Sequence, residues 1–182
     1  MSTAVKQRII DAALHIIGTD GVAAVSNRRI ATQAGVSLGS ITYHFATQTD
    51  LLHEALLDWV TGENDRLTAL ADQYRHTSPD IETAAALVDR IAGDIAFSAE
   101  RIAEFELYIQ AGRTPALRAA AAECFAAYDT LAGTILTAIG VPNPEQAAKT
   151  LVAVVTGMRL RQLATGAPDP GLTQALILVA RP

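Results

Sequence analysis

Apolar residues recur at spacings of three and four along almost the whole chain, which is the pattern of helices that bury one face. The clearest runs are rich in alanine and leucine and cover residues 83–97, 114–139 and 143–166. No segment alternates strictly between apolar and polar residues with turn residues on both sides, so the pattern does not indicate a sheet. The chain is therefore predicted to be all-α.

Glycine, proline and serine clusters divide this pattern into about nine helices, the shorter ones first. The first helix begins near residue 4 and ends at 18–21, and a helix that begins at Thr47 runs to about Tyr74. Thr47 and Asp50 have the spacing of a capping box, with the acid in the place usually held by Glu or Gln. Later breaks fall at residues 76–80, 112–115, 140–144 and 166–171.

The stretch "IATQAGVSLGSITYHF" near the N-terminus predicts two short helices joined by a tight turn. Ser26 is a candidate N-cap for a helix at 28–34, and Gly35 suits the left-handed residue that ends such a helix. Ser37 then caps a second helix at 38–44. Two short helices that cross through a glycine-containing turn form a helix-turn-helix, although proteins that bind no DNA also contain this arrangement.

The charge of the chain is unevenly distributed. The net charge is −5, but residues 1–49 hold four basic and two acidic side chains, which gives +2, whereas residues 50–182 hold ten basic and seventeen acidic ones, which gives −7. The acidic total argues against a general nucleic-acid binder. A contact with a polyanion is therefore expected only in the N-terminal region.

Cysteine usage and the first helix indicate the compartment. Cys124 is the single cysteine, so an intramolecular disulfide cannot form and a buried thiol in a reducing compartment is expected. Charged residues interrupt the apolar positions of the first helix, which argues against a signal peptide or a membrane span. We therefore expect a cytoplasmic protein with no membrane contact.

Residues Arg8 to Leu52 contain a set of motifs at characteristic spacing: "RIIDAAL" in the first helix, the Gly21 turn, "IA..AGVS.G", "HF" and the closing "LL". This part of the chain resembles the tetracycline-repressor (TetR) family of bacterial transcription regulators. The resemblance implies a helix-turn-helix DNA-binding domain at 1–48 and an effector-binding and dimerisation domain at 49–182. It also implies a homodimer that represses by binding a palindromic double-stranded operator and is released by a small-molecule effector, with no cofactor.

Carried over by position, the resemblance implies that the second and third helices contact DNA. The residues so implied are Ser26, Arg28, Arg29, Ser37, Leu38, Gly39, Ser40, Thr42, Tyr43, His44 and Gln48. The family usually has Tyr at Thr42 and Lys at Gln48, and both anchor phosphates. Operator binding is therefore expected to be weaker or less dependent on salt than is usual in the family.

Four of these residues have a simpler, structural alternative. Arg28 and Arg29 are also compatible with solvated surface, Tyr43 with a ring packed against the first helix, and His44 with a helix-terminal hydrogen bond. Leu38 on a polar face is harder to explain by structure alone, and it is suited to contact a thymine methyl group.

The resemblance places an effector pocket among the helices after residue 48, where aromatic side chains are the candidates for its lining. The candidate residues are Trp59, Ile95, Phe97, Arg101, Phe105, Tyr108 and Phe125, with Glu104 or Gln110 as further polar anchors. Aromatic residues at helical spacing also serve as core, and Arg101 with Glu104 also fits a surface pair. The small number of aromatic residues means that a large flat cation is not favoured over a smaller apolar or acidic effector.

Two late helices are too apolar to remain exposed, so they are the candidates for the dimer interface. The residues are Leu151, Val154, Val155, Met158, Leu160, Leu172 and Leu176, and Gly157 would let a partner helix approach closely. The alternative is that these residues pack within their own subunit.

An enzyme is the main alternative class, and the sequence gives it little support. It contains no phosphate-binding glycine loop, no paired Cys or His ligands and no His-x-x-x-His spacing, so no catalytic or metal-binding residue is assigned. Glu54 and Asp58 lie one turn apart beside His53, but acidic helix faces of this kind are common. A helical ligand-binding or adaptor protein with weakened DNA binding remains the other alternative, because of Thr42 and Gln48.

Overall fold

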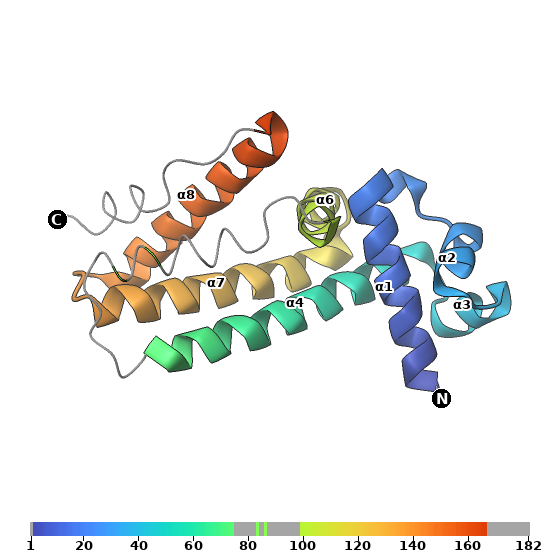
Figure 1. Ribbon diagram of the computed structural model, residues 1–182, viewed down its shortest axis with the longest axis horizontal. Coiled ribbons are helices and arrows are strands. Elements are labelled where there is room, and N and C mark those ends of the chain that lie inside the picture. The colour runs from blue at the N-terminus through green and yellow to red at the C-terminus, as the bar shows by residue number, and fades with distance from the viewer. Residues whose placement is uncertain (1, 75–82, 84–85, 87–98, 167–182) are drawn as a thin grey trace. The chain divides into compact units, whose positions relative to one another are not determined.

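The computed structural model describes residues 2–74, 83, 86 and 99–166, and these form helices joined by short turns (Figure 1). No strand occurs within these ranges, so the all-α prediction is confirmed. Apart from residues 83 and 86, the apolar run at 83–97 lies outside the described residues, as does the late segment that contains Leu172 and Leu176. The elements are α1 (Ser2–Asp20), the 3-10 helix η1 (Val22–Ala24), α2 (Asn27–Ala34), α3 (Leu38–His44), α4 (Gln48–Tyr74), α6 (Ala99–Arg113), the 3-10 helix η2 (Pro115–Leu117), α7 (Arg118–Ala138) and α8 (Pro144–Thr165).

The chain divides into two compact units. The first consists of Met1–Gly62 and Phe97–Ala122, and the second of Glu63–Ala96 and Glu123–Pro182. The first unit thus contains α6 in addition to the three N-terminal helices. The functional division into residues 1–48 and 49–182 remains a prediction.

The core of the first unit is built on α1, whose apolar face is buried from Ile9 to Ile17. Helices α2 and α3 lie beside α1 in Figure 1, and the start of α4 and α6 complete the unit. Burial of large aliphatic side chains in this core contributes about 1.5–3 kcal/mol each. The fully buried large side chains of the unit are Ile9, Ile16, Ile17, Ile30, Ile41, Leu51, Leu56, Leu107 and Leu117.

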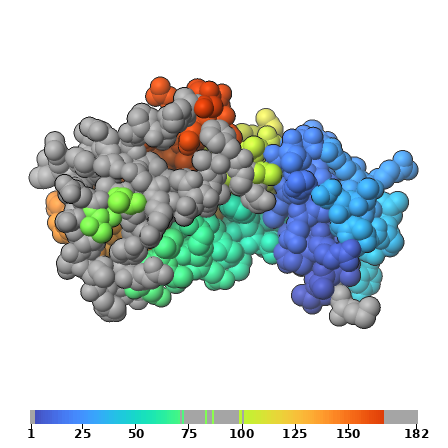
Figure 2. Space-filling model, viewed as in Figure 1, coloured from blue at the N-terminus to red at the C-terminus, as the bar shows by residue number. Residues whose placement is uncertain are grey.

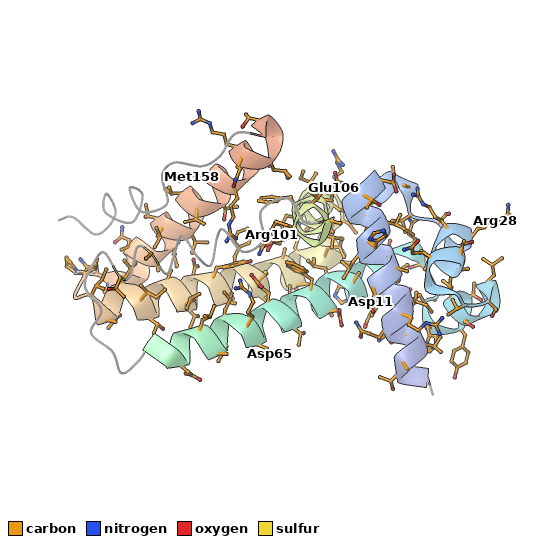
Figure 3. All side chains as sticks on the ribbon, in the orientation of Figure 1. Asp11, Arg28, Asp65, Arg101, Glu106 and Met158 are labelled. Carbon is orange, nitrogen blue, oxygen red and sulfur yellow. The ribbon has the colours of Figure 1, made fainter. Side chains whose placement is uncertain are left out.

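Helices α1 and α6 approach until their backbones touch. A Cβ atom added at Gly18 would lie 1.8 Å from the carbonyl oxygen of Ala99, a distance that no side chain tolerates. About two turns further along α6, the Glu106 carboxylate, labelled in Figure 3, lies 3.5 Å from the backbone nitrogen of Val22. The glycine is therefore required by close packing, and not by the end of the helix, since α1 continues to Asp20.

The second unit contains the later part of α4, most of α7, and α8. Its buried core consists of Leu67, Leu131, Ala132, Ile135, Leu136, Ala148 and Leu151. Cys124 on α7 is buried and forms no disulfide, as expected. Among the helices that the structure describes, none has both the length and the apolar character needed to cross a bilayer.

Candidate nucleic-acid interface

The turn between α2 and α3 has the geometry that its residues predict. The Ser26 hydroxyl accepts a hydrogen bond from the Arg29 amide at 3.4 Å, and Gly35 ends α2 with φ of 61°, in the left-handed region. The Ser37 hydroxyl accepts from the Ser40 amide at 3.1 Å and so caps α3. Both predicted caps and the predicted glycine are confirmed, and α3 has the predicted bounds.

Arg8 of α1 holds this turn from the other side. Its Nη2 atom donates to the carbonyl oxygen of Ala34 and, at 3.0 Å, to that of Gly35. These carbonyls lie at the C-terminus of α2, where no intrahelical donor is left and a cation is favourable. Sequence reasoning treated Arg8 only as part of a motif. The carbonyl groups at the C-terminus of α2 require a hydrogen-bond donor, and this requirement could have indicated the role of Arg8.

Helix α3 has one buried residue, Ile41, and presents most of its remaining surface to solvent. Leu38 is 50% exposed and Tyr43 is 81% exposed, although both are large and partly apolar. The exposure of Tyr43 excludes the alternative that its ring packs against α1. Its ring instead contacts that of His44 edge-on, with 5.1 Å between the centroids. In the space-filling view, the N-terminal helices are drawn in blue to light blue (Figure 2).

Three of the four basic side chains near the N-terminus have partners within the protein. Lys6 forms an ion pair with Glu54 at 2.7 Å, Arg29 forms one with Asp20, and Arg8 is held by the turn. Arg28 is exposed, has no partner among the described residues, and points away from the helices (Figure 3). Of these four, Arg28 is therefore the best placed for a phosphate.

The two positions that depart from the family pattern have internal hydrogen bonds. Thr42 Oγ1 donates to the Gly39 carbonyl at 3.2 Å, and the Gln48 amide donates to the Val25 carbonyl at 3.2 Å. Gln48 thereby ties the start of α4 to the segment before α2. The predicted capping box is also confirmed, since Thr47 and Asp50 each accept from the other's backbone amide, at 3.1 and 2.9 Å.

Four of the predicted effector residues lie together on α4 and α6, in the first unit. The guanidinium carbon of Arg101 lies 5.4 Å from the centroid of the Trp59 ring, and the ring centroids of Phe105 and Tyr108 are 6.4 Å apart. Arg101 also pairs with Glu104, and both are buried, at 5% and 4% exposure. The alternative of a surface pair is therefore wrong. Ile95 and Phe97 lie outside the described residues, and Phe125 belongs to the second unit.

A second buried carboxylate, which sequence reasoning missed, lies in the second unit. Glu63 accepts from both Nε and Nη2 of Arg66 at 2.8 Å, and the Tyr128 hydroxyl donates to it at 2.5 Å. Tyr128 is 65 residues away from Glu63 in the sequence, so local spacing gave no signal of this contact.

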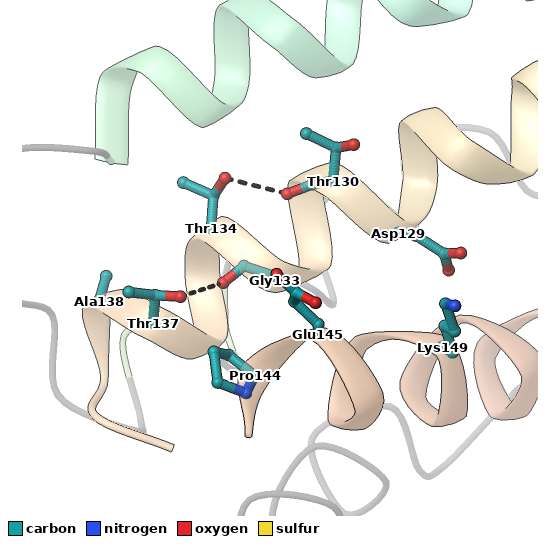
Figure 4. A pocket seen from close by; sticks show the side chains of 9 residues that line it. All are labelled: Asp129, Thr130, Gly133, Thr134, Thr137, Ala138, Pro144, Glu145 and Lys149. Carbon is teal, nitrogen blue, oxygen red and sulfur yellow. Dashed lines mark hydrogen bonds between the residues drawn. The ribbon is translucent and has the colours of Figure 1, made fainter. Parts of the chain in front are cut away.

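A groove of about 680 Å³ runs along α7 and α8 of the second unit (Figure 4). The side chains of Asp129 and Lys149 point toward one another in this groove. A Cβ at Gly133 would lie 3.9 Å from that of Ala148, an ordinary van der Waals distance, so α7 and α8 lie close together at this point. The lining residues are Asp129, Thr130, Gly133, Thr134, Thr137, Ala138, Pro144, Glu145 and Lys149.

The predicted interface residues of α8 fall into two groups. Leu151 belongs to the buried core of its own subunit, in line with the alternative of internal packing, and Val155 and Met158 are partly buried and pack against that core. Val154 and Leu160 are exposed, and a Cβ at Gly157 would meet no atom within 4 Å. Leu172 and Leu176 lie outside the described residues.

The acidic residues considered for a metal are occupied by other partners. Glu54 pairs with Lys6, and Asp58 accepts from the Gln7 amide at 3.0 Å. Across the described ranges, no group of three or more His, Cys, Asp or Glu side chains is arranged to hold a metal ion.

Comparison with known proteins gives two family matches. Residues 9–55 match "Bacterial regulatory proteins, tetR family", and residues 77–181 match "Tetracyclin repressor-like, C-terminal domain", which alone covers more than half of the chain. A comparison with curated protein sequences finds no match.

Solved structures agree with these matches. The multidrug binding protein EbrR in complex with ethidium is 33% identical, with a TM-score of 0.79 over 98% of this chain and 99% of that chain. A TetR-family member from Streptomyces coelicolor A3 is 34% identical, with a TM-score of 0.77 over the same shares. A putative TetR-family regulator from Mesorhizobium loti, at 20% identity, has the same fold with a TM-score of 0.79 over 99% of this chain and 95% of that chain. The chain therefore belongs to the TetR family of bacterial transcriptional regulators, which bind DNA and are not enzymes.

Proposed function

We propose that the protein is a repressor that binds a palindromic operator as a homodimer and leaves it when a small molecule binds. The observation that carries this proposal is the exposure of Leu38 and Tyr43 on α3, a helix of seven residues with a single buried side chain. Folding alone does not require two large side chains in this position. A helix that lies in the major groove of DNA uses such side chains to contact bases and backbone.

The proposed interface divides its contacts between phosphates and bases. Arg28 lies on the exposed surface of α2 and has the charge to contact a phosphate. Leu38, Gly39 and Thr42 are exposed along α3, and Gly39 allows its backbone close to base edges. Since Thr42 and Gln48 bond within the protein, the proposed phosphate contacts per subunit are few, and the affinity for DNA should depend only weakly on salt.

Arg28→Ala is expected to weaken binding to all duplexes alike and to reduce the slope of log affinity against log salt concentration by about 1. Leu38→Ala should instead change which bases are preferred, at a cost of roughly 1–3 kcal/mol for the best site. The measurement is selection from random duplexes followed by a salt titration of each variant. Arg29→Ala is the control, because Arg29 pairs with Asp20. Equal losses on selected and random DNA for Leu38→Ala would contradict its assigned role.

We place the dimer contact on the exposed face of α8. Val154 and Leu160 are its exposed apolar side chains, and Gly157 between them leaves room for a helix of the partner. A two-fold arrangement would present two copies of α3 about one DNA turn apart, or a small multiple of this, which matches a palindromic operator.

Leu160→Glu is expected to convert the dimer to a monomer, because a charge at the centre of an apolar contact is left without solvation. Gly157→Leu should have the same effect by steric exclusion, although the subunit alone has room for the new side chain. Light scattering at micromolar concentration measures the mass. A monomeric wild-type protein, or variants that remain dimeric, would rule out this interface.

We further propose that the effector is an aromatic cation, a class that the composition of the chain did not favour over smaller apolar or acidic molecules. EbrR, which is 33–34% identical in its complexes with ethidium and proflavin, is described as multidrug binding. Both compounds are planar organic cations. The support in this chain is the buried carboxylate of Glu104, on a helix that also carries the aromatic residues Phe105 and Tyr108.

The test is a DNA-binding titration with and without ethidium, on an operator selected from random duplexes. Binding of the operator by the wild-type dimer and its loss on addition of ethidium are the expected results. Failure of the selection to enrich any sequence would favour the alternative, a ligand-binding or adaptor protein with weakened DNA binding.

A further inference from the structure

We propose that Trp59, Arg101, Glu104 and Tyr108, here called the cation cluster, recognise the effector, and that Arg101 occupies the place its cationic group takes on binding. This inference rests on the proposed function, because it assigns the residues that recognise the effector. All four residues belong to the first compact unit.

The cluster has the geometry of a binding site for a planar cation, and the guanidinium of Arg101 occupies that site. The guanidinium of Arg101 is planar and delocalised, and it lies 5.4 Å from the Trp59 ring centroid, within the range of a cation–π contact. The Glu104 carboxylate neutralises its charge, and the Tyr108 hydroxyl donates to that carboxylate at 2.7 Å. An aromatic face and a buried carboxylate are the two groups that an organic cation requires.

The energetics favour exchange of one cation for another. A buried ion pair stabilises a fold little, because desolvation of both charges offsets their attraction, whereas removal of one partner alone is strongly unfavourable. Arg101 therefore cannot simply leave Glu104. A ligand cation that replaces the guanidinium keeps the carboxylate neutralised and lets Arg101 return to water, so the exchange avoids the unpaired state.

Trp59 supplies a second, independent observation. Its indole Nε1 atom is buried and has no hydrogen-bond partner among the residues that the structure describes. A buried donor without a partner is unfavourable by roughly 1–3 kcal/mol, and such groups are rare in folded proteins. A ligand bound at the cluster that carries an acceptor would satisfy this donor.

The cluster is also next to the contact between α6 and α1. Arg101 follows Ala99 by two residues, and the Ala99 carbonyl is the atom that Gly18 of α1 approaches. Replacement of the Arg101 side chain by a ligand therefore acts at the start of α6, in the same compact unit as α2 and α3.

The test is a fluorescence titration of the full-length protein with ethidium in the absence of DNA. Glu104→Gln keeps the shape of the side chain and removes its charge, so it should weaken binding at least about tenfold, or ~1.4 kcal/mol. Arg101→Gln should tighten binding by a similar factor, since it removes the internal competitor. The double variant Arg101→Gln/Glu104→Gln removes both charges of this buried ion pair together, so it should fold as well as the wild type and bind as weakly as Glu104→Gln.

Glu63→Gln is the matched control, because Glu63 also accepts from an arginine three residues away and from a tyrosine hydroxyl. It should change ethidium affinity less than about twofold. Thermal unfolding of each variant shows whether it is folded. Unchanged affinity in the folded double variant, an equal loss in Glu63→Gln, or absence of ethidium binding in the wild type would each overturn the inference. Operator binding and release are measured separately, and these measurements test the proposed function.

Discussion

Gly18→Ala is expected to lower the free energy of unfolding by about 2–3 kcal/mol, the largest loss of stability that we expect from adding one methyl group. The added carbon would lie 1.8 Å from the Ala99 carbonyl oxygen. That oxygen is backbone, so relief requires α1 and α6 to separate, and the contacts along both helices are lost with them. Chemical denaturation followed by circular dichroism measures the change.

Gly62→Ala is the control for this substitution. Gly62 also lies within a helix, α4, but a Cβ there would meet no atom within 4 Å. Alanine should therefore stabilise the protein by about 0.5–1 kcal/mol through the higher helix propensity alone. A Gly18→Ala protein as stable as the wild type would show that the close approach of the two helices is not required.

Arg8→Ala is expected to weaken operator binding strongly, although Arg8 donates to the turn between α2 and α3 and not to DNA. The variant loses the hydrogen bonds from the guanidinium to the carbonyls of Ala34 and Gly35, each worth about 1.5–3 kcal/mol for a charged donor. The angle between α2 and α3 is then less well defined, so α3 cannot insert into the groove in one orientation. Unfolding and operator affinity are measured on the same preparation.

Lys6→Ala provides the comparison for Arg8→Ala, because it removes the same charge from the same helix. The ion pair between Lys6 and Glu54 is more than one-third exposed, so its loss should cost less than about 1 kcal/mol. If both variants lose equal affinity for the operator, the effect of Arg8 comes from its charge and not from the turn.

The helix-turn-helix could be predicted almost to the residue because its signals are local. Ser26, Gly35 and Ser37 each act on backbone groups within four residues, and the structure places all three as the sequence indicates. The capping box of Thr47 and Asp50 is local in the same sense.

Contacts between distant parts of the chain could not be predicted in this way. The hydrogen bond of Gln48 to Val25 spans 23 residues, and those of Arg8 to the turn span 26 and 27. The spacing of Arg101 and Glu104 is the same for an exposed pair and for a buried one, so only the packing of α4 and α6 distinguishes them. Leu151 has the same ambiguity, since an apolar face does not reveal whether it meets its own subunit or another.

The threonines of α7 make the groove beside α8 less polar than its residue types suggest. Thr130, Thr134 and Thr137 each donate their hydroxyl hydrogen to the carbonyl four residues earlier, at 2.8, 2.9 and 2.7 Å. With these donors already satisfied inside the helix, the side chains need no water for them and can offer their methyl groups to whatever enters. This threonine wall is thus less hydrophilic than its one-letter code suggests, and the strongly polar groups of the groove are the charged side chains of Asp129, Glu145 and Lys149.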